Sequence, residues 1–180
     1  MCRPARPFRR GSDGDQAVKT LLIVWYSRTG GSRQLAEAAR DGALEAGGVT
    51  VRHLAAGEAQ AEDLLAADGY IFACPENLAA IAGVMKAFFD RTYYEVLGRI
   101  EGRPYAALIC AGSDGMNAKA QLERIATGWR LKRVADTQVV NVGAQTTEEI
   151  LAKKVISEAE LAGARELGAT LAAGLEMGVF

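Results

Sequence analysis

The fold of this chain is decided by the stretch Ile23-Val24-Trp25-Tyr26-Ser27-Arg28-Thr29-Gly30-Gly31-Ser32-Arg33. Residues 21–26 form an apolar run typical of a buried strand, and residues 34–40 have the composition of a helix. Between them lies a hexapeptide rich in hydroxyl groups and glycine. Its two glycines let the backbone turn tightly, and the first N–H groups of a helix have no partner within that helix. We therefore expect a strand, an anion-binding loop and a helix, with the loop suited to a phosphate.

The hexapeptide 27–32, called the phosphate loop below, differs from two common phosphate-binding motifs. It has no lysine for a P-loop, and it lacks the three spaced glycines of the dinucleotide fingerprint. It fits [ST]-x-T-G-x-[ST] instead, with Ser27, Thr29, Gly30 and Ser32 at the matching positions. In this it resembles the FMN phosphate loop of the flavodoxin-like family. An ordinary turn that caps a helix is the alternative interpretation.

Size and charge restrict the possible functions. The 180 residues suit one domain, and 49% hydrophobic with 24% charged residues is a globular composition. The net charge of −1 argues against a nucleic-acid partner, which requires a basic face. No apolar stretch reaches the ~20 residues of a membrane span, so we expect no membrane partner.

The cysteines indicate a reducing compartment. Cys2, Cys74 and Cys110 are odd in number, widely spaced and form no CxxC pair, and the chain has a single histidine. We therefore predict no metal site and a cytoplasmic location.

Composition changes near residue 17. Residues 1–16 contain four arginines and two prolines but little to bury, and they lack the apolar core of a signal peptide. We predict a disordered basic tail over residues 1–16 and a single flavodoxin-like FMN-binding domain over residues 17–180.

Strand and helix patterns alternate along this domain. The predicted strands cover residues 19–26, 49–54, 69–73, 105–111 and 134–142. The predicted helices cover residues 32–46, 62–67, 81–97, 117–131 and 157–174. Alternation of this kind predicts an α/β fold with a doubly wound parallel sheet between two layers of helices. Five strands fit the flavodoxin-like order 2-1-3-4-5, in which the ligand lies at the carboxyl ends of the strands.

Three loops should meet at that ligand, because they follow the first, third and fourth strands. The second loop begins at Pro75, and the third is the glycine-rich stretch that begins at Ala111. The predicted cofactor-binding residues are Ser27, Arg28, Thr29, Gly30, Gly31, Ser32, Pro75, Glu76, Asn77, Leu78, Ala79, Ala111, Gly112, Ser113, Asp114 and Gly115.

The second loop and the following helix extend the resemblance. The loop Pro75-Glu76-Asn77 and the segment Lys86-Ala87-Phe88-Phe89-Asp90-Arg91 resemble the NADPH-dependent FMN reductase and WrbA-like branch of the family. The resemblance implies bound FMN and NADPH or NADH as co-substrate. It also implies a small electron acceptor such as a quinone or a flavin, and a homodimer or homotetramer. Because the cofactor supplies the chemistry, we assign no catalytic acid or base.

Two other functions stay open at this point. One is a flavodoxin-type electron carrier without its own NAD(P)H turnover, although the second and third loops lack the aromatic residues that such carriers place against the ring. The other is a cofactor-free interaction domain, because a fold does not fix a function.

Several conspicuous residues have plainer interpretations. We predict that His53 is structural and that Cys74 is a buried, inert thiol rather than a redox group. Tyr93 and Tyr94 suit core or subunit-interface packing. For Trp129 an interface is one possibility, and the sequence does not decide it.

Overall fold

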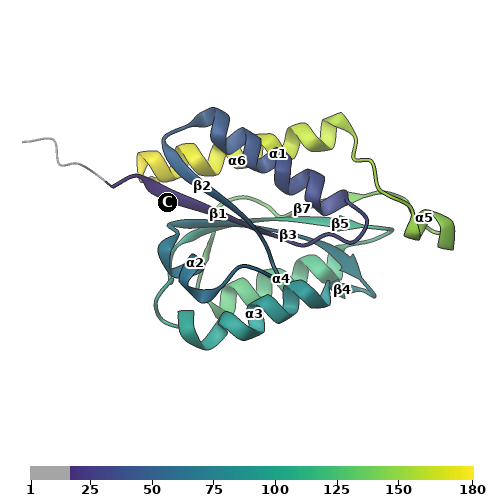
Figure 1. Cartoon of the computed structure of the whole chain (residues 1–180), viewed down its shortest axis with the longest axis horizontal. Coiled ribbons are helices and arrows are strands. Elements are labelled where there is room, and N and C mark those ends of the chain that lie inside the picture. The colour runs from purple at the N-terminus through teal and green to yellow at the C-terminus, as the bar shows by residue number, and fades with distance from the viewer. Residues whose placement is uncertain (1–16) are drawn as a thin grey trace, which may run out of the picture.

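The computed structural model describes residues 17–180 (Figure 1), so the predicted basic tail over residues 1–16 lies outside the described residues. The sheet contains strands in the spatial order β2-β1-β3-β5-β6, with β4 paired to β3 and β7 paired to β5. The strands are β1 (Lys19–Trp25), β2 (Val49–Ala55), β3 (Gly69–Asn77), β4 (Ala80–Ile81), β5 (Pro104–Ala111), β6 (Lys132–Arg133) and β7 (Gln138–Asn141).

The pairing confirms the predicted topology. The pairs of β1 with β2, β1 with β3, β3 with β5, and β5 with both β6 and β7 are all parallel. If β6 and β7 count together as the fifth strand, the order is 2-1-3-4-5. The order reverses between β1 and β3, where the carboxyl ends of the strands diverge and leave room for a ligand.

Helices cover both faces of the sheet. In Figure 1, α1 (Gly31–Ala46) and α6 (Glu158–Met177) lie on one face, and α3 (Gly83–Val96) and α4 (Met116–Gly128) lie on the other. The short helix α2 (Ala61–Ala66) joins the second layer. Side chains of β1 alternate between the two cores: Leu21 and Ile23 face α1 and α6, and Leu22 and Val24 face the other helices. The sheet is therefore buried on both sides, as a parallel sheet requires.

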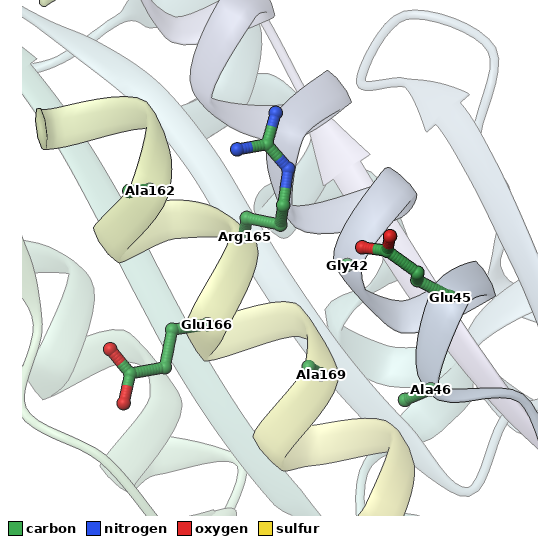
Figure 2. Close-up of a pocket in the computed structure, with 7 residues that line it drawn as sticks. All are labelled: Gly42, Glu45, Ala46, Ala162, Arg165, Glu166 and Ala169. Atoms are coloured by element: carbon green, nitrogen blue, oxygen red, sulfur yellow. The ribbon is translucent and has the colours of Figure 1, made fainter. Parts of the chain in front are cut away.

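Helices α1 and α6 approach closely because glycine stands at their contacts. A Cβ on Gly168 would lie 1.8 Å from the Ala39 carbonyl oxygen, and a Cβ on Gly42 would lie 2.0 Å from the Arg165 carbonyl oxygen. A hollow of about 430 Å³ lies beside this contact. Figure 2 shows the residues that line it, which are small or charged and come from the two helices. The hollow lies toward the end of α1 that is remote from the phosphate loop.

Three element predictions were wrong. The predicted strand 134–142 is too long: only β7 (Gln138–Asn141) lies within it, and β6 lies just before it. The chain bends at Ala135 between the two strands, and the buried hydroxyl of Thr137 donates to the Glu123 carboxylate at 2.7 Å. Residues 74–77, predicted as a loop, extend β3, which turns back through β4 as a hairpin. The helix α5 (Thr147–Leu151) had not been predicted.

Burial narrows the alternatives that the sequence left open for two aromatic residues. Trp129, for which an interface was one possibility, is 2% exposed and packs against Phe72, Phe88 and Phe89 in the core. Tyr94 is 83% exposed, which excludes core packing for that side chain. Within residues 17–180 no helix is long and apolar enough to cross a membrane, and no cluster of metal-ligating side chains is found.

Candidate functional site

A cavity of about 650 Å³ lies at the carboxyl ends of β1, β3 and β5, where the topology places a ligand. It is larger than the hollow between α1 and α6, and residues of all three predicted loops line it. Its lining residues are Arg28, Thr29, Pro75, Glu76, Asn77, Leu78, Ala79, Cys110, Ala111, Gly112, Ser113, Val142, Ala144, Ile150, Leu151 and Lys154.

The phosphate loop leads directly into α1. Gly30 has φ of 93° at the N-cap, a left-handed conformation that glycine adopts without strain. Its N–H donates to Ser27 Oγ at 3.0 Å, which fixes the turn. Ser32 is 1% exposed, and its Oγ has no hydrogen-bond partner. A buried hydroxyl without a partner beside the free N–H groups of a helix N-terminus fits an anionic ligand group.

The end of β5 supports the phosphate loop from below. A Cβ on Gly31 would lie 2.5 Å from Cys110 Sγ, so any larger residue at this position requires the thiol or the loop to shift. Burial raises the pKa of the Cys110 thiol to about 11, and the negative charge of Glu160 adds to the effect. Cys110 is therefore a neutral thiol at neutral pH, and its sulfur packs against the phosphate loop at Gly31.

The second loop is the turn of the β3–β4 hairpin. Glu76 pairs with Ile81 and Asn77 with Ala80, so Leu78 and Ala79 form a two-residue turn with φ of 51° and 58°. Such a turn normally contains asparagine and glycine, because other residues are strained at positive φ. Leu78 is fully exposed at the cavity edge.

Helix α4 holds this strained turn in place. Asn117 Nδ2 donates to the Ala79 carbonyl oxygen, and the Ile81 N–H donates to Gln121 Oε1 at 2.8 Å. Strain that is maintained by contacts from a neighbouring element is a frequent property of functional loops.

Glu76 joins the second loop to the third. Its Oε2 accepts a hydrogen bond from the Gly115 N–H at 2.8 Å, while its Oε1 is buried without a partner. Gly115, with φ of 84°, is the N-cap of α4. The carboxylate thereby fixes the distance between the loops on two sides of the cavity.

The structure brings together most of the predicted site residues. Ten line the cavity: Arg28, Thr29, the five residues from Pro75 to Ala79, and Ala111, Gly112 and Ser113. The remaining six do not line it: Ser27, Gly30, Gly31, Ser32, Asp114 and Gly115. All six lie within or cap the three loops, and Asp114 is exposed in the third loop.

Six lining residues had not been predicted: Cys110, Val142, Ala144, Ile150, Leu151 and Lys154. Most belong to the segment between β7 and α6, which passes over the phosphate loop. The pattern Thr146-x-x-Glu149 is a capping box, in which each residue satisfies a backbone N–H of the other, and it was the available sequence signal for α5.

His53 and Cys74 lie outside the cavity lining. His53 stacks on Trp25 with 5.4 Å between ring centroids, and its pKa is lowered by burial and by the charge of Arg40. Cys74 is fully buried, and burial raises its pKa to about 12, which confirms the prediction of an inert thiol.

Curated relatives match about half of the chain. A flavodoxin of Aquifex aeolicus is 34% identical over 95 residues, which are 53% of this chain and 51% of that protein. An NAD(P)H dehydrogenase (quinone) of Acidithiobacillus ferrooxidans is 32% identical over 95 residues, 42% of this chain and 48% of that protein. The match thus spans about half the length of each of these relatives.

Solved structures share the fold at low identity. A flavodoxin from the domain Archaea superposes with a TM-score of 0.72 at 16% identity, covering 87% of this chain and 99% of that chain. An apo NADH:FMN oxidoreductase gives 0.65 at 16% identity, covering 87% and 89% of the two chains. Residues 53–146 match the family described as NADPH-dependent FMN reductase, and this range includes the second and third loops of the cavity. The chain therefore belongs to the NADPH-dependent FMN reductase family, and its fold is flavodoxin-like.

Proposed function

We propose that this protein binds FMN in the cavity at the carboxyl ends of the strands and passes electrons from NAD(P)H through FMN to a small acceptor. The observation that carries the proposal is the phosphate loop, which ends at the α1 N-terminus beside a buried, unpartnered Ser32 hydroxyl. This loop opens through Arg28 and Thr29 into a cavity that two further loops complete.

The chain has suitable groups for each part of FMN. The phosphate group would be held by the N–H groups at the start of α1 and the hydroxyls of the phosphate loop, with the guanidinium of Arg28 nearby. The ring would lie between the β3–β4 hairpin and the third loop, whose small residues let the backbone approach a planar ligand. When bound, FMN supplies the capacity to accept a hydride and release electrons.

The composition of the cavity lining bears on the NAD(P)H part of the proposal. The cavity volume of about 650 Å³ lies within the range of roughly 300–1,000 Å³ usual for ligand pockets. Among the described residues that line it, none is aromatic. An isoalloxazine ring held there has no aromatic cover, which leaves a face for the nicotinamide of NAD(P)H.

An electron carrier without NAD(P)H turnover is the second candidate. Similarity to the Aquifex flavodoxin, at 34% identity over 95 residues, favours it. The absence of aromatic residues from the described lining favours the reductase, because a carrier benefits from a shielded ring.

Flavin titration tests the first half of the proposal. Added FMN should lose its fluorescence on binding, and riboflavin, which lacks the phosphate, should bind at least about tenfold more weakly, since a hydrogen bond to a charged group contributes about 1.5–3 kcal/mol. FAD, whose flavin phosphate is joined to AMP through a pyrophosphate linkage, should also bind more weakly. No quenching by FMN would exclude both flavoprotein candidates.

Anaerobic reduction then separates the reductase from the carrier. FMN-loaded protein mixed with NADPH or NADH should lose the visible absorbance of oxidised flavin rapidly, and a quinone should restore it. Tight FMN binding without bleaching by either nucleotide would favour the electron carrier.

A further inference from the structure

Residues 143–156, called the strap below, connect β7 to α6 and pass across the phosphate loop. The Lys154 N–H donates to the Thr29 carbonyl oxygen at 2.8 Å. In Figure 1 the helix of the strap, α5, stands apart from both helix layers at the carboxyl-terminal end of the sheet. The strap thus lies at the cavity but outside the main body of the fold.

The side chain of Gln34 fastens the strap to the phosphate loop. Its Nε2 donates to the Lys154 carbonyl oxygen at 2.8 Å and to the Gly30 carbonyl oxygen at 3.0 Å. Its Oε1 accepts a hydrogen bond from the Ile156 N–H at 3.2 Å. One amide therefore joins the first turn of α1, the phosphate loop and a segment about 120 positions later in the chain.

Among the described residues the strap has few other anchors. The side chain of Ile156, at the end of the strap, is 4% exposed and packs in the core, whereas residues 143–155 are exposed or half-buried. Helix α5 has no buried residue, and Ile150 and Leu151 are 52% and 65% exposed although both line the cavity. The Lys154 ammonium bonds to carbonyl oxygens of Glu149, Ile150 and Ala152, all within the strap itself. Few buried contacts predict a segment that opens locally at low free-energy cost.

We propose that Gln34 is a positioning residue that couples the phosphate loop to the strap, so that a ligand in the loop and the seated strap stabilise each other. The seated strap places Ile150 and Leu151 at the edge of the cavity, where they exclude water from a bound ring. The ligand part of this inference rests on the proposed binding of FMN, whereas the fastening by Gln34 does not.

Coupling of this kind is reciprocal. If FMN binds only the form with the strap seated, the apparent dissociation constant of FMN equals the intrinsic constant divided by the fraction of molecules in that form. Bound FMN in return raises that fraction. A variant that releases the strap should therefore bind FMN more weakly, although Gln34 itself is not placed against the ligand.

Trypsin provides a direct measure of strap opening, because Lys153 and Lys154 are consecutive cleavage sites within it. The Gln34→Met variant keeps the length and helix propensity of the side chain but removes all three hydrogen bonds. Each neutral hydrogen bond changes an equilibrium by roughly two- to tenfold. We expect cleavage after these lysines to become at least about tenfold faster, with cleavage elsewhere unchanged.

Arg40→Met is the matched control. Arg40 lies on the same helix and bonds only to Asp41 among the described residues. It should leave strap cleavage at the rate of the parent protein. Equal rates for Gln34→Met and the parent would overturn the fastening role, and faster cleavage at every tryptic site would show general destabilisation instead.

Hydrogen exchange tests the coupling between FMN and the strap on the parent protein itself. The amides of Lys154 and Ile156 should exchange more slowly when FMN is bound, and tryptic cleavage of the strap should slow by a similar factor. FMN binding without either change would overturn the coupling. If FMN fails to bind, the proposed function fails, while the proteolysis of FMN-free protein still decides the role of Gln34.

Discussion

Gly31 lies directly against Cys110, so that a Cβ on the glycine would stand 2.5 Å from the thiol sulfur. This contact joins the phosphate loop to the carboxyl end of β5. The loop is therefore positioned by the sheet beneath it as well as by the helix that follows.

Replacement of Gly31 by alanine should displace the loop or the thiol. Overpacking of this kind costs roughly 1–3 kcal/mol of unfolding free energy. The double variant Gly31→Ala/Cys110→Ala should recover at least half of that loss, because it removes the sulfur that the new methyl group meets. Urea unfolding of the two single variants and the double variant measures the coupling. Strictly additive effects would contradict the contact.

Much of the fold was predictable because each prediction depended on a strong local signal. The phosphate loop is marked by its hydroxyls and glycines, and the strand before it is a continuous apolar run. Strands alternate with helices along the chain, which indicates a parallel sheet. Because the connections between parallel strands are right-handed, only a few topologies are then possible. The convergence of three loops at one cavity followed from the predicted strand order.

The parts that were missed have weak local signals. The β3–β4 turn contains Leu78 and Ala79, neither of which favours positive φ, so nothing in the sequence marks a hairpin. Helix α5 has only five residues and none is buried, so it has no apolar periodicity. The fastening of the strap by Gln34 depends on a contact between residues about 120 positions apart, which sequence patterns do not record.

The strain in the β3–β4 turn leads to a stability prediction. A left-handed conformation costs roughly 1–2 kcal/mol for a residue with a side chain. The double substitution Leu78→Asn/Ala79→Gly should therefore raise the unfolding free energy by about 1–2 kcal/mol, since Leu78 loses no buried contact. Leu78→Ala, which keeps the unfavourable φ, should change stability by less than about 0.5 kcal/mol. Equal effects of the two changes in urea unfolding would show that the turn is not strained.

The buried thiols predict a loss of stability at alkaline pH. Burial raises the pKa of Cys74 to about 12, whereas an unfolded cysteine titrates near 8.5. Above pH ~9 the unfolded chain releases this proton while the folded chain keeps it, so the unfolding free energy falls as pH rises. Each such group contributes a slope of about 1.4 kcal/mol per pH unit.

Cys74→Ala isolates this contribution. It should lower stability slightly at pH 7, through the lost side-chain volume, and flatten the decline between pH 9 and 11 by about 1.4 kcal/mol per pH unit. Urea unfolding at several pH values measures the slope. An unchanged slope would mean that Cys74 is accessible to base in the folded state.

The Ser32 hydroxyl is predicted to bind the ligand rather than to stabilise the fold. Its hydroxyl is buried and has no partner in the structure, so it contributes no hydrogen bond to the fold. Ser32→Ala should therefore leave the stability of the FMN-free protein unchanged or raise it by up to about 1 kcal/mol, because an unsatisfied polar group is removed. The same change should weaken FMN binding by about ten- to hundredfold, the effect of one lost hydrogen bond to a charged group.

Ser27→Ala is the contrasting variant. Ser27 Oγ accepts the Gly30 N–H at 3.0 Å, so its loss should lower the stability of the FMN-free protein by about 1 kcal/mol. Thermal unfolding without ligand and fluorescence titration with FMN give the two quantities for each variant. A Ser32→Ala protein that is less stable without FMN but binds it as tightly as the parent would assign the hydroxyl to the fold. The opposite result, intact stability with weakened FMN binding, is what a hydroxyl reserved for the phosphate requires.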